Sequence, residues 1–413
     1  MNRRVVITGL GAVTPVGNDA DTFWNNIKNG VCGIDFIKSF DTEGFKAKLA
    51  AEVKDFNPED YMEKKEARRL DRFCQFAIAA AAQAVSDADL DVEKVDKERF
   101  GVIVGSGIGG IGNIESEKIK LIERGPNRVH PLFIPMVISN MAAGNISIKF
   151  GAKGPCTNIV TACATGTNCI GEAFRMIKDG ISDIMIAGGT EAAITPLTIA
   201  GFTSLTALSK SSDPLRASIP FDKERNGFVM GEGSGILILE SLEHAKARGA
   251  KIYGELVGYG STCDAYHITS PSPDGEGAAR AIEIAIKEAN IDPGEVSYIN
   301  AHGTGTSVND KFETAAIKRA FGEDIAKKIP ISSSKSMIGH LLGAGGAVEG
   351  VIALKALYDG FIPPTIGYKV PDEECDLDYV PNKGRKANLE YVMSDSLGFG
   401  GHNAVILLKK WSE

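Results

Sequence analysis

Three residues of this sequence could perform covalent chemistry together, one cysteine and two histidines, each set among small residues. Cys163 stands in ACATG, His302 in AHGTGT and His340 in GHLLGAGG. Glycine close to each histidine lets backbone and substrate approach closely. A thiol with imidazoles brought near it by the fold makes a candidate nucleophilic site. Either histidine alone is more often a structural residue.

Cys163 is expected at an elbow between a strand and a helix. Residues 157–161 read as a strand, and from Ile170 apolar residues recur at the i, i+3, i+4 and i+7 spacing of a helix. Unpaired amides and the macrodipole at the helix N-terminus favour the thiolate, so we expect a lowered thiol pKa. A lone cysteine is more often a small buried hydrophobe, which is how we interpret Cys156 and Cys169.

A glycine-rich segment, GFGG, follows the strand-like residues 391–394 and places Phe399 in a flexible loop. The amide of Phe399 could supply half of an oxyanion hole on a movable lid. The alternative is an ordinary glycine-rich turn.

Another glycine pattern supports a rival function. Gly107, Gly109 and Gly112 follow the expected strand 100–104 and match a dinucleotide-binding fingerprint, as in a nicotinamide-dependent oxidoreductase. That fingerprint requires a second strand ending in a ribose-binding acid about 20 residues later. The chain instead runs through the charged residues 115–124 into Pro126, which weakens the rival.

Composition excludes several classes. The 413 residues carry a formal charge of −8, which argues against nucleic-acid binding, and no apolar stretch is long enough to insert in a membrane. Arg3 and Arg4 before an apolar run could begin a signal peptide, but Gly9, Gly11 and Pro15 favour a strand and turn. Seven cysteines without a CxxC pair fit neither a disulfide framework nor a zinc site, so we expect a cytoplasmic protein.

One basic cluster could face an acidic protein partner. Lys64, Lys65, Arg68 and Arg69 have the spacing of one helical face. The alternative is that these residues, which alternate with acidic ones, form an ordinary solvent-exposed helix face.

Strands and helices alternate along the chain, which predicts an α/β fold with a mostly parallel sheet. Strands are expected at residues 4–8, 100–104, 184–187, 236–240, 297–301, 329–333 and 404–408, and helices at 64–86, 163–178, 242–248, 277–289, 312–320 and 346–358. At an offset of 180 residues, segment 166–180 matches segment 346–360. We therefore expect two related halves, residues 1–250 with the cysteine and residues 251–413 with both histidines.

Four motifs in order resemble the β-ketoacyl-acyl carrier protein synthases, the condensing enzymes of fatty acid synthesis, and most of all the elongating synthase II class. They are VTACATGTN, AHGTGT, KSMIGHLLGAGG and GFGGHN, and the likeness extends from VVITGLGAVTPVG to the last strand. The resemblance implies a thiolase-like fold of duplicated βαβαβαββ halves in a five-layered αβαβα sandwich. It also implies a homodimer that acts on acyl and malonyl groups held by acyl carrier protein, without a metal or organic cofactor.

The resemblance also implies roles for individual residues. Cys163 is the nucleophile, His302 and His340 stabilise the malonyl-derived enolate, and the amide of Phe399 completes the oxyanion hole. Two histidines are typical of elongating synthases, whereas initiating synthases use histidine and asparagine, and noncatalytic chain-length factors lack the cysteine. The other implied residues are Lys335 and Glu349 as supports, Ile108 in the acyl pocket, Thr269, Thr304 and Thr306 along the pantetheine tunnel, and Lys65, Arg68 and Arg69 for carrier-protein docking. Gly305 and Gly345 replace the serine and alanine common in the family, which leaves every titrating group in place.

Overall fold

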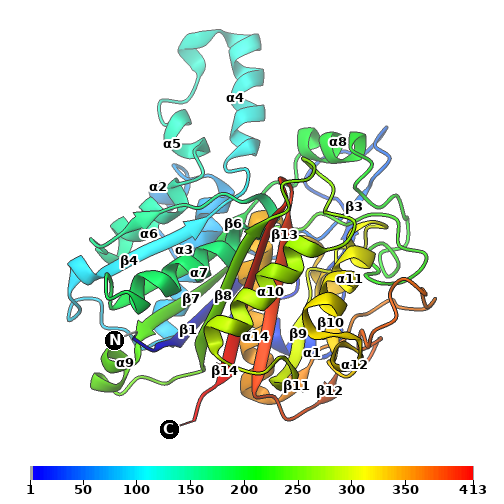
Figure 1. Ribbon diagram of the computed structural model, residues 1–413. Helices are drawn as coiled ribbons and strands as arrows, with labels where there is room; N and C mark the ends of the chain where they lie inside the picture. Colours follow the sequence, from blue (N-terminus) through cyan, green and yellow to red (C-terminus); the bar gives the residue numbers. More distant parts are fainter. Residues whose placement is uncertain (1–2, 413) are drawn as a thin grey trace.

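Ten strands join into one hydrogen-bonded sheet in the computed structural model, which describes residues 3–412 (Figure 1). Their order is β10-β9-β13-β14-β8-β1-β7-β6-β4-β5, so two five-stranded halves repeat the same arrangement outward from the centre. The amino-terminal strands are β1 (Val5–Val13), β4 (Phe100–Gly105), β5 (Cys156–Thr157), β6 (Ile184–Glu191) and β7 (Gly233–Ser241). The carboxyl-terminal strands are β8 (Gly254–Cys263), β9 (Val296–Asn300), β10 (Ile331–Ser332), β13 (Tyr391–Gly398) and β14 (His402–Lys410).

The halves meet where β1 pairs antiparallel with β8, at Val5, Val6 and Ile7. Two small two-stranded sheets lie outside the main one. They are formed by β2 (Asp35–Phe36) with β3 (Leu49–Ala50) and by β11 (Phe361–Ile362) with β12 (Arg385–Lys386).

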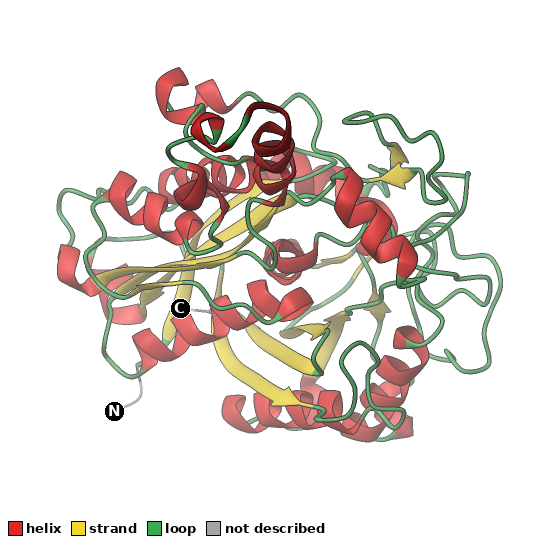
Figure 2. Cartoon of the chain, turned by 90° about the horizontal axis from the view of Figure 1, so that it is seen from above, coloured by secondary structure: helices red, strands yellow, loops and turns green. Residues whose placement is uncertain are grey.

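Helices occupy three layers, and Figure 2 shows them on either side of the strands. In the outer layers α3 (Arg72–Asp87) and α6 (Met141–Phe150) pack on the first half of the sheet, and α10 (Glu276–Ala289) with α11 (Asn309–Phe321) covers the second. Between the halves lie α7 (Thr165–Lys178) and α14 (Gly345–Asp359), which contact each other and strands of both halves. The remaining helices are α1 (Ala20–Lys28), α2 (Lys64–Ala67), α4 (Ile111–Arg124), α5 (Phe133–Val137), α8 (Pro196–Ser204), α9 (Leu242–Ala247), α12 (Glu323–Ala326) and α13 (Lys335–Ile338).

The strands are apolar on both faces because each half is covered on both sides. Along β4, Val102 and Val104 belong to the core under α3 and α6, whereas Ile103 belongs to the central core around α7 and α14. Along β13, Met393 faces α10 and α11, and Val392 faces the central core. The five-layered thiolase-like sandwich expected from the sequence is therefore confirmed.

Glycine pairs show the duplication at atomic detail. In β1, a Cβ on Gly11 would lie 1.9 Å from the carbonyl oxygen of Ala80 in α3. In β8, a Cβ on Gly260 would lie 1.9 Å from the carbonyl oxygen of Ala281 in α10. Each half therefore packs an outer helix directly on a glycine-bearing strand. Strand interiors seldom contain glycine, so the sequence gives little sign of β8.

Three expectations need correction. The sheet is not mostly parallel, because the last strand of each half, β7 or β14, runs antiparallel to both of its neighbours and β1 pairs antiparallel with β8. Parallel pairing is confined to β5–β4–β6 in the first half and β10–β9–β13 in the second. The helix expected at 64–86 is broken into α2 and α3, because the Asp71 side chain accepts a hydrogen bond from the amide of Phe73 and caps α3. The basic cluster consequently lies on one short helix turn and the segment after it, not on one long helical face. The strand expected at 157–161 pairs only over Cys156–Thr157, where it lies beside β4.

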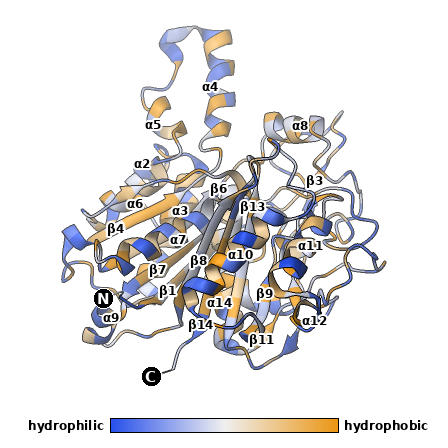
Figure 3. Ribbon diagram, in the orientation of Figure 1, coloured by the Kyte–Doolittle hydropathy of each residue, from blue (hydrophilic) through white to orange (hydrophobic). Residues whose placement is uncertain are grey.

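An arm formed by α4 and α5 projects from the body of the protein (Figure 1). It carries exposed apolar side chains, including Ile119, Ile122 and Ile134, and Figure 3 shows hydrophobic positions along α4. Within residues 3–412, no helix combines the length and apolar character needed to cross a membrane.

The close contact of β8 with α10 gives a test of the packing. Gly260→Ala should lower the free energy of unfolding by about 1–3 kcal/mol, because the added methyl group forces the helix away from the strand. Chemical denaturation measures the change. Gly294→Ala is the matched control, because no atom lies within 4 Å of a Cβ there, and its effect should stay within about 0.5 kcal/mol. Equal stability of both variants would contradict the close packing.

Candidate active site

Cys163 lies in a single helical turn, Ala162–Ala164, that leads directly into α7. Ala162 adopts a left-handed backbone conformation, with φ of 50°, which turns the chain sharply into the helix. Small residues are required here because α7 crosses α14 closely: a Cβ on Gly166 would lie 2.5 Å from the amide nitrogen of Ala347. The expected elbow is thus present, although the segment before it is mostly irregular.

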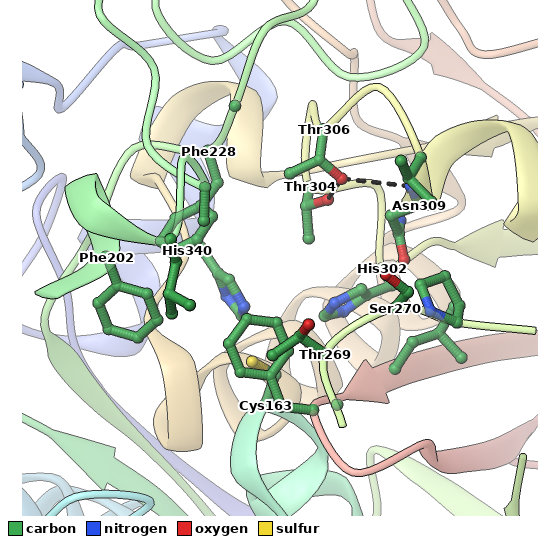
Figure 4. A pocket seen from close by; sticks show the side chains of 18 of the residues that line it. Cys163, Phe202, Phe228, Thr269, Ser270, His302, Thr304, Thr306, Asn309 and His340 are labelled. Carbon is green, nitrogen blue, oxygen red and sulfur yellow. Dashed lines mark hydrogen bonds between the residues drawn. The ribbon is translucent and has the colours of Figure 1, made fainter. Parts of the chain in front are cut away.

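His302 and His340 reach the same place from the other half. His302 follows β9 by two residues, and His340 follows α13, where it pairs with Met230 in an isolated bridge. The two ring centroids are 5.2 Å apart, with the ring planes at 87°. With Cys163 they line one cavity of about 310 Å³, and Figure 4 shows the sulfur and both rings facing a common space.

Both imidazoles are neutral in this environment. Burial lowers the pKa of His302 and of His340 well below the usual value, and the nearby charge of Lys335 lowers both further. Nδ1 of each ring is buried and has no hydrogen-bond partner in the part of the chain that is described. A neutral ring has one N–H donor, so each histidine can offer one hydrogen bond to an oxygen in the cavity.

Lys335 connects the histidines to the interior without touching the cavity. Its Nζ donates to the carbonyl oxygen of His302 at 2.5 Å and to the carboxylate of Glu349. Lys335 and Glu349 are each 1% exposed. Burial raises the pKa of Glu349 to about 7, although Lys335 acts to lower it. Lys335, held by Glu349, therefore fixes the His302 backbone, and its positive charge adds to burial in keeping both rings neutral.

The expectation of a lowered pKa for Cys163 is wrong for this cavity. Burial raises the pKa of its thiol to about 12, although the charge of Lys335 and the amide of Phe399 act in the opposite direction. The pKa of buried Cys169 is raised to about 12 as well. What distinguishes Cys163 is its position on the cavity, opposite two hydrogen-bond donors.

The GFGG segment lies directly against the elbow. A Cβ on Gly398 would lie 2.6 Å from the carbonyl oxygen of Thr161, so only glycine fits, and Gly400 has a φ of 85°. The amide of Gly400 donates to the carbonyl oxygen of Ile268 at 2.7 Å. This contact ties the segment to a second cavity loop, and Phe399 itself lines the cavity.

The other expected residues separate into two groups. Thr269, Thr304 and Thr306 line the cavity with Cys163 and the two histidines. Ile108 does not line it, but packs with Cys163 on a neighbouring apolar cluster that contains Leu342. Lys65, Arg68 and Arg69 are exposed and lie outside the cavity.

Sequence reasoning missed several residues of the cavity wall. Phe202, Phe228, Asp264 and Asn403 all line it, and the Asn403 side chain donates to the Asp264 carboxylate at 2.7 Å. Asn403 lies within the GFGGHN motif, and that was the available signal. Phe202 and Phe228 have none, because aromatic residues in helices and loops usually serve packing.

The geometry rules out the dinucleotide interpretation of Gly107, Gly109 and Gly112. The amides of Gly107 and Ile108, which would have to hold a pyrophosphate, donate instead to the buried carboxylate of Glu191. No anion can bind where a carboxylate of the same chain already takes the donors.

Comparison with known proteins identifies the family of this chain. Residues 2–245 match the family described as Beta-ketoacyl synthase, N-terminal domain, and residues 253–369 match Beta-ketoacyl synthase, C-terminal domain. The protein named 3-oxoacyl-[acyl-carrier-protein] synthase 2 from Staphylococcus aureus (strain COL) is 55% identical to this chain over 410 residues, which cover 99% of both chains. The protein of that name from Synechocystis sp. is 53% identical, covering 99% of this chain and 98% of its own.

Solved structures give the same result. A ketosynthase of a type II polyketide synthase, in complex with its acyl-carrier protein, superposes with a TM-score of 0.93 at 40% identity, covering 100% of both chains. A β-ketoacyl synthase from Burkholderia phymatum STM815 superposes with a TM-score of 0.92 at 34% identity, covering 99% of this chain and 100% of its own. With both halves matched and the cysteine and two histidines gathered on one cavity, this chain belongs to the β-ketoacyl synthase family.

Proposed function

We propose that this protein elongates fatty acyl chains by two carbons, through decarboxylative condensation of acyl-acyl carrier protein with malonyl-acyl carrier protein. One observation carries the proposal: a thiol at a helix elbow of the first half faces two neutral imidazoles of the second half across one cavity. The relatives' names, 3-oxoacyl-[acyl-carrier-protein] synthase 2, supply the class of substrate. Residues 1–250 and 251–413 are the two proposed functional halves.

The first half-reaction loads the acyl group. Cys163 attacks the acyl thioester carbonyl, and the amides of Cys163 and Phe399 donate to the oxyanion. The bond to the carrier sulfur then breaks, leaving an acyl thioester on Cys163. Because its pKa is raised, the Cys163 thiol is protonated before the reaction and loses its proton during the attack. The departing carrier thiol gains one proton, so the step balances.

The second half-reaction uses the histidines. His302 and His340 each donate one hydrogen bond to the thioester oxygen of the malonyl group, where negative charge develops as carbon dioxide leaves. The resulting carbanion attacks the acyl carbonyl on Cys163, the carbon–sulfur bond breaks, and the thiolate that leaves takes a proton from water to restore the thiol. The thioester itself activates both carbons, so the mechanism calls for no metal or organic cofactor.

The cavity supports this division of labour. Thr304 and Thr306, whose hydroxyl oxygens are 3.0 Å apart, lie on the wall with Thr269 and offer polar contacts to the pantetheine amides. Lys335 and Glu349 act as positioning residues behind His302. Ile108 limits the acyl chain from the neighbouring apolar cluster.

Two macromolecular contacts complete the proposal. Exposed Lys65, Arg68 and Arg69 form a docking patch for the acidic carrier protein. The apolar arm and the short strand β5, which ends the sheet, provide a surface for a second copy of the chain in a homodimer. A cytoplasmic setting suits seven cysteines that are all free thiols.

The histidine assignment can be tested by separating the two half-reactions. His302→Ala and His340→Ala should each slow carbon dioxide release from malonyl-carrier protein about a hundredfold, on the order of 3 kcal/mol, because one transition-state donor is lost. Loading of labelled acyl groups onto Cys163 should be affected less. Cys163→Ala is the control, since it should fail to load but still decarboxylate. Normal decarboxylation with failed loading in both histidine variants would show that the histidines serve the thiol.

The docking patch can be tested by charge reversal. Changing Lys65, Arg68 and Arg69 together to Glu should raise KM for acyl-carrier protein at least tenfold, about 1.4 kcal/mol, and the effect should shrink at high salt. KM for a short acyl-pantetheine thioester should stay unchanged, because that substrate does not need the protein surface. Lys328→Glu, an exposed lysine of the second half, is the matched control. An equal rise of KM for both substrates would place the damage in the cavity and contradict docking.

A further inference from the structure

Glu191 is a buried carboxylate that the proposed mechanism does not use. It ends β6, is 0% exposed and accepts four hydrogen bonds. Oε1 accepts from the Ser106 hydroxyl at 2.7 Å and from the amide of Ile108 at 3.2 Å. Oε2 accepts from the amides of Gly107 at 2.9 Å and Gly343 at 3.0 Å.

The donors around Glu191 match a charged carboxylate. Burial raises its pKa, and the four hydrogen bonds act in the opposite direction. Three of the partners are backbone amides, which can donate but cannot accept, so they favour the ionised form. An anion held by amides in the interior is a strong geometric restraint on the segments that supply those amides.

Those segments come from different halves of the protein. Gly107 and Ile108 belong to the loop after β4, and Gly343 belongs to the single turn Leu342–Ala344 that follows His340. The two backbones touch, since a Cβ on Gly343 would lie 2.4 Å from the amide nitrogen of Gly107. Glu191 therefore fixes the Ile108 loop against the His340 turn.

The turn at Gly343 is the internal counterpart of the nucleophile elbow. Ala162 and Leu342, 180 positions apart, both have a φ of 50°, and each starts a single helical turn that leads into a central helix. Gly343 thus occupies the position of Cys163. Its amide holds a carboxylate oxygen, as the Cys163 amide is proposed to hold the oxyanion.

The segments held by Glu191 carry two side chains, Ile108 and Leu342, that lie on the apolar surface beside Cys163. Leu342 belongs to the buried cluster against which Ile108 and Cys163 pack, and Leu342 also lines the cavity. Movement of either backbone would change the space next to an acyl group on Cys163.

We propose that Glu191 is a positioning residue for acyl-chain selection, which ties the Ile108 loop to the turn after His340 and so sets the wall beside Cys163. This inference rests on the proposed function and deepens it. Glu191 touches no reacting atom, so its loss alters which acyl chains load rather than whether malonyl groups lose carbon dioxide.

Glu191→Gln tests this assignment, because it keeps the shape and places an amide NH₂ among donors. With a series of acyl-carrier proteins, the ratio of kcat/KM for loading a tetradecanoyl over an octanoyl group should change about tenfold, equivalent to roughly 1.4 kcal/mol. Decarboxylation of malonyl-carrier protein should change less than threefold. Ser106→Ala, which removes one of the four donors, should shift the ratio in the same direction by a smaller factor, and it decides the question alone if Glu191→Gln does not fold.

Glu240→Gln is the matched control, since Glu240 is also a buried carboxylate, bonded to Thr8, His244 and Arg248. It should lower the melting temperature and leave the chain-length ratio unchanged. An unchanged ratio in Glu191→Gln and Ser106→Ala, or an equal loss for every chain length, would overturn the assignment. Absence of any acyl group on Cys163 in the unaltered protein would overturn the proposed function instead.

Discussion

The crossing of α7 and α14 is the contact on which the site depends. Gly166 and Gly346 stand at this crossing, 180 positions apart, and a Cβ on Gly166 would lie 2.5 Å from the amide nitrogen of Ala347. Backbones this close leave no room for side chains, so the two elbows that precede the helices are pressed together. One elbow presents Cys163 and the other follows His340 by two residues, and the cavity between them is a consequence of the helix crossing.

The protonation states of the buried groups around the cavity depend on the same close packing. Lys335 is the cation beside both histidines, and it is itself paired with Glu349. An unpaired buried lysine would be costly, and a protonated imidazole beside it more so. The rings are therefore held neutral, and each neutral ring keeps one N–H that can donate to an oxygen in the cavity. The same burial raises the pKa of the Cys163 thiol, and the charge of Lys335 offsets that rise only in part.

The sequence allowed the elbow, the two histidines and the duplication to be predicted because each left a local signal. Small residues around Cys163, glycine near each histidine and the match at 180 positions are all visible without coordinates. Strand β8 left no such signal, since its glycines serve contact with α10 and weaken the strand pattern. The direction of the Cys163 pKa was also beyond reach, because a helix terminus is local but burial depends on both halves.

Glu191 shows why the remaining part of the site could not be predicted. An acid at the end of a strand is ordinary in sequence, and one of its donors, Gly343, lies 152 positions away. The role of Glu191 becomes visible only in the fold, which has two equivalent elbows, and at the second one the Gly343 amide donates to the Glu191 carboxylate. Duplication alone gives two elbows of similar backbone geometry, since Ala162 and Leu342 both have a φ of 50° and each starts a single helical turn. Glu191 takes the amide of Gly343, the counterpart of the Cys163 amide, and of these two equivalent positions only Cys163 lines the cavity.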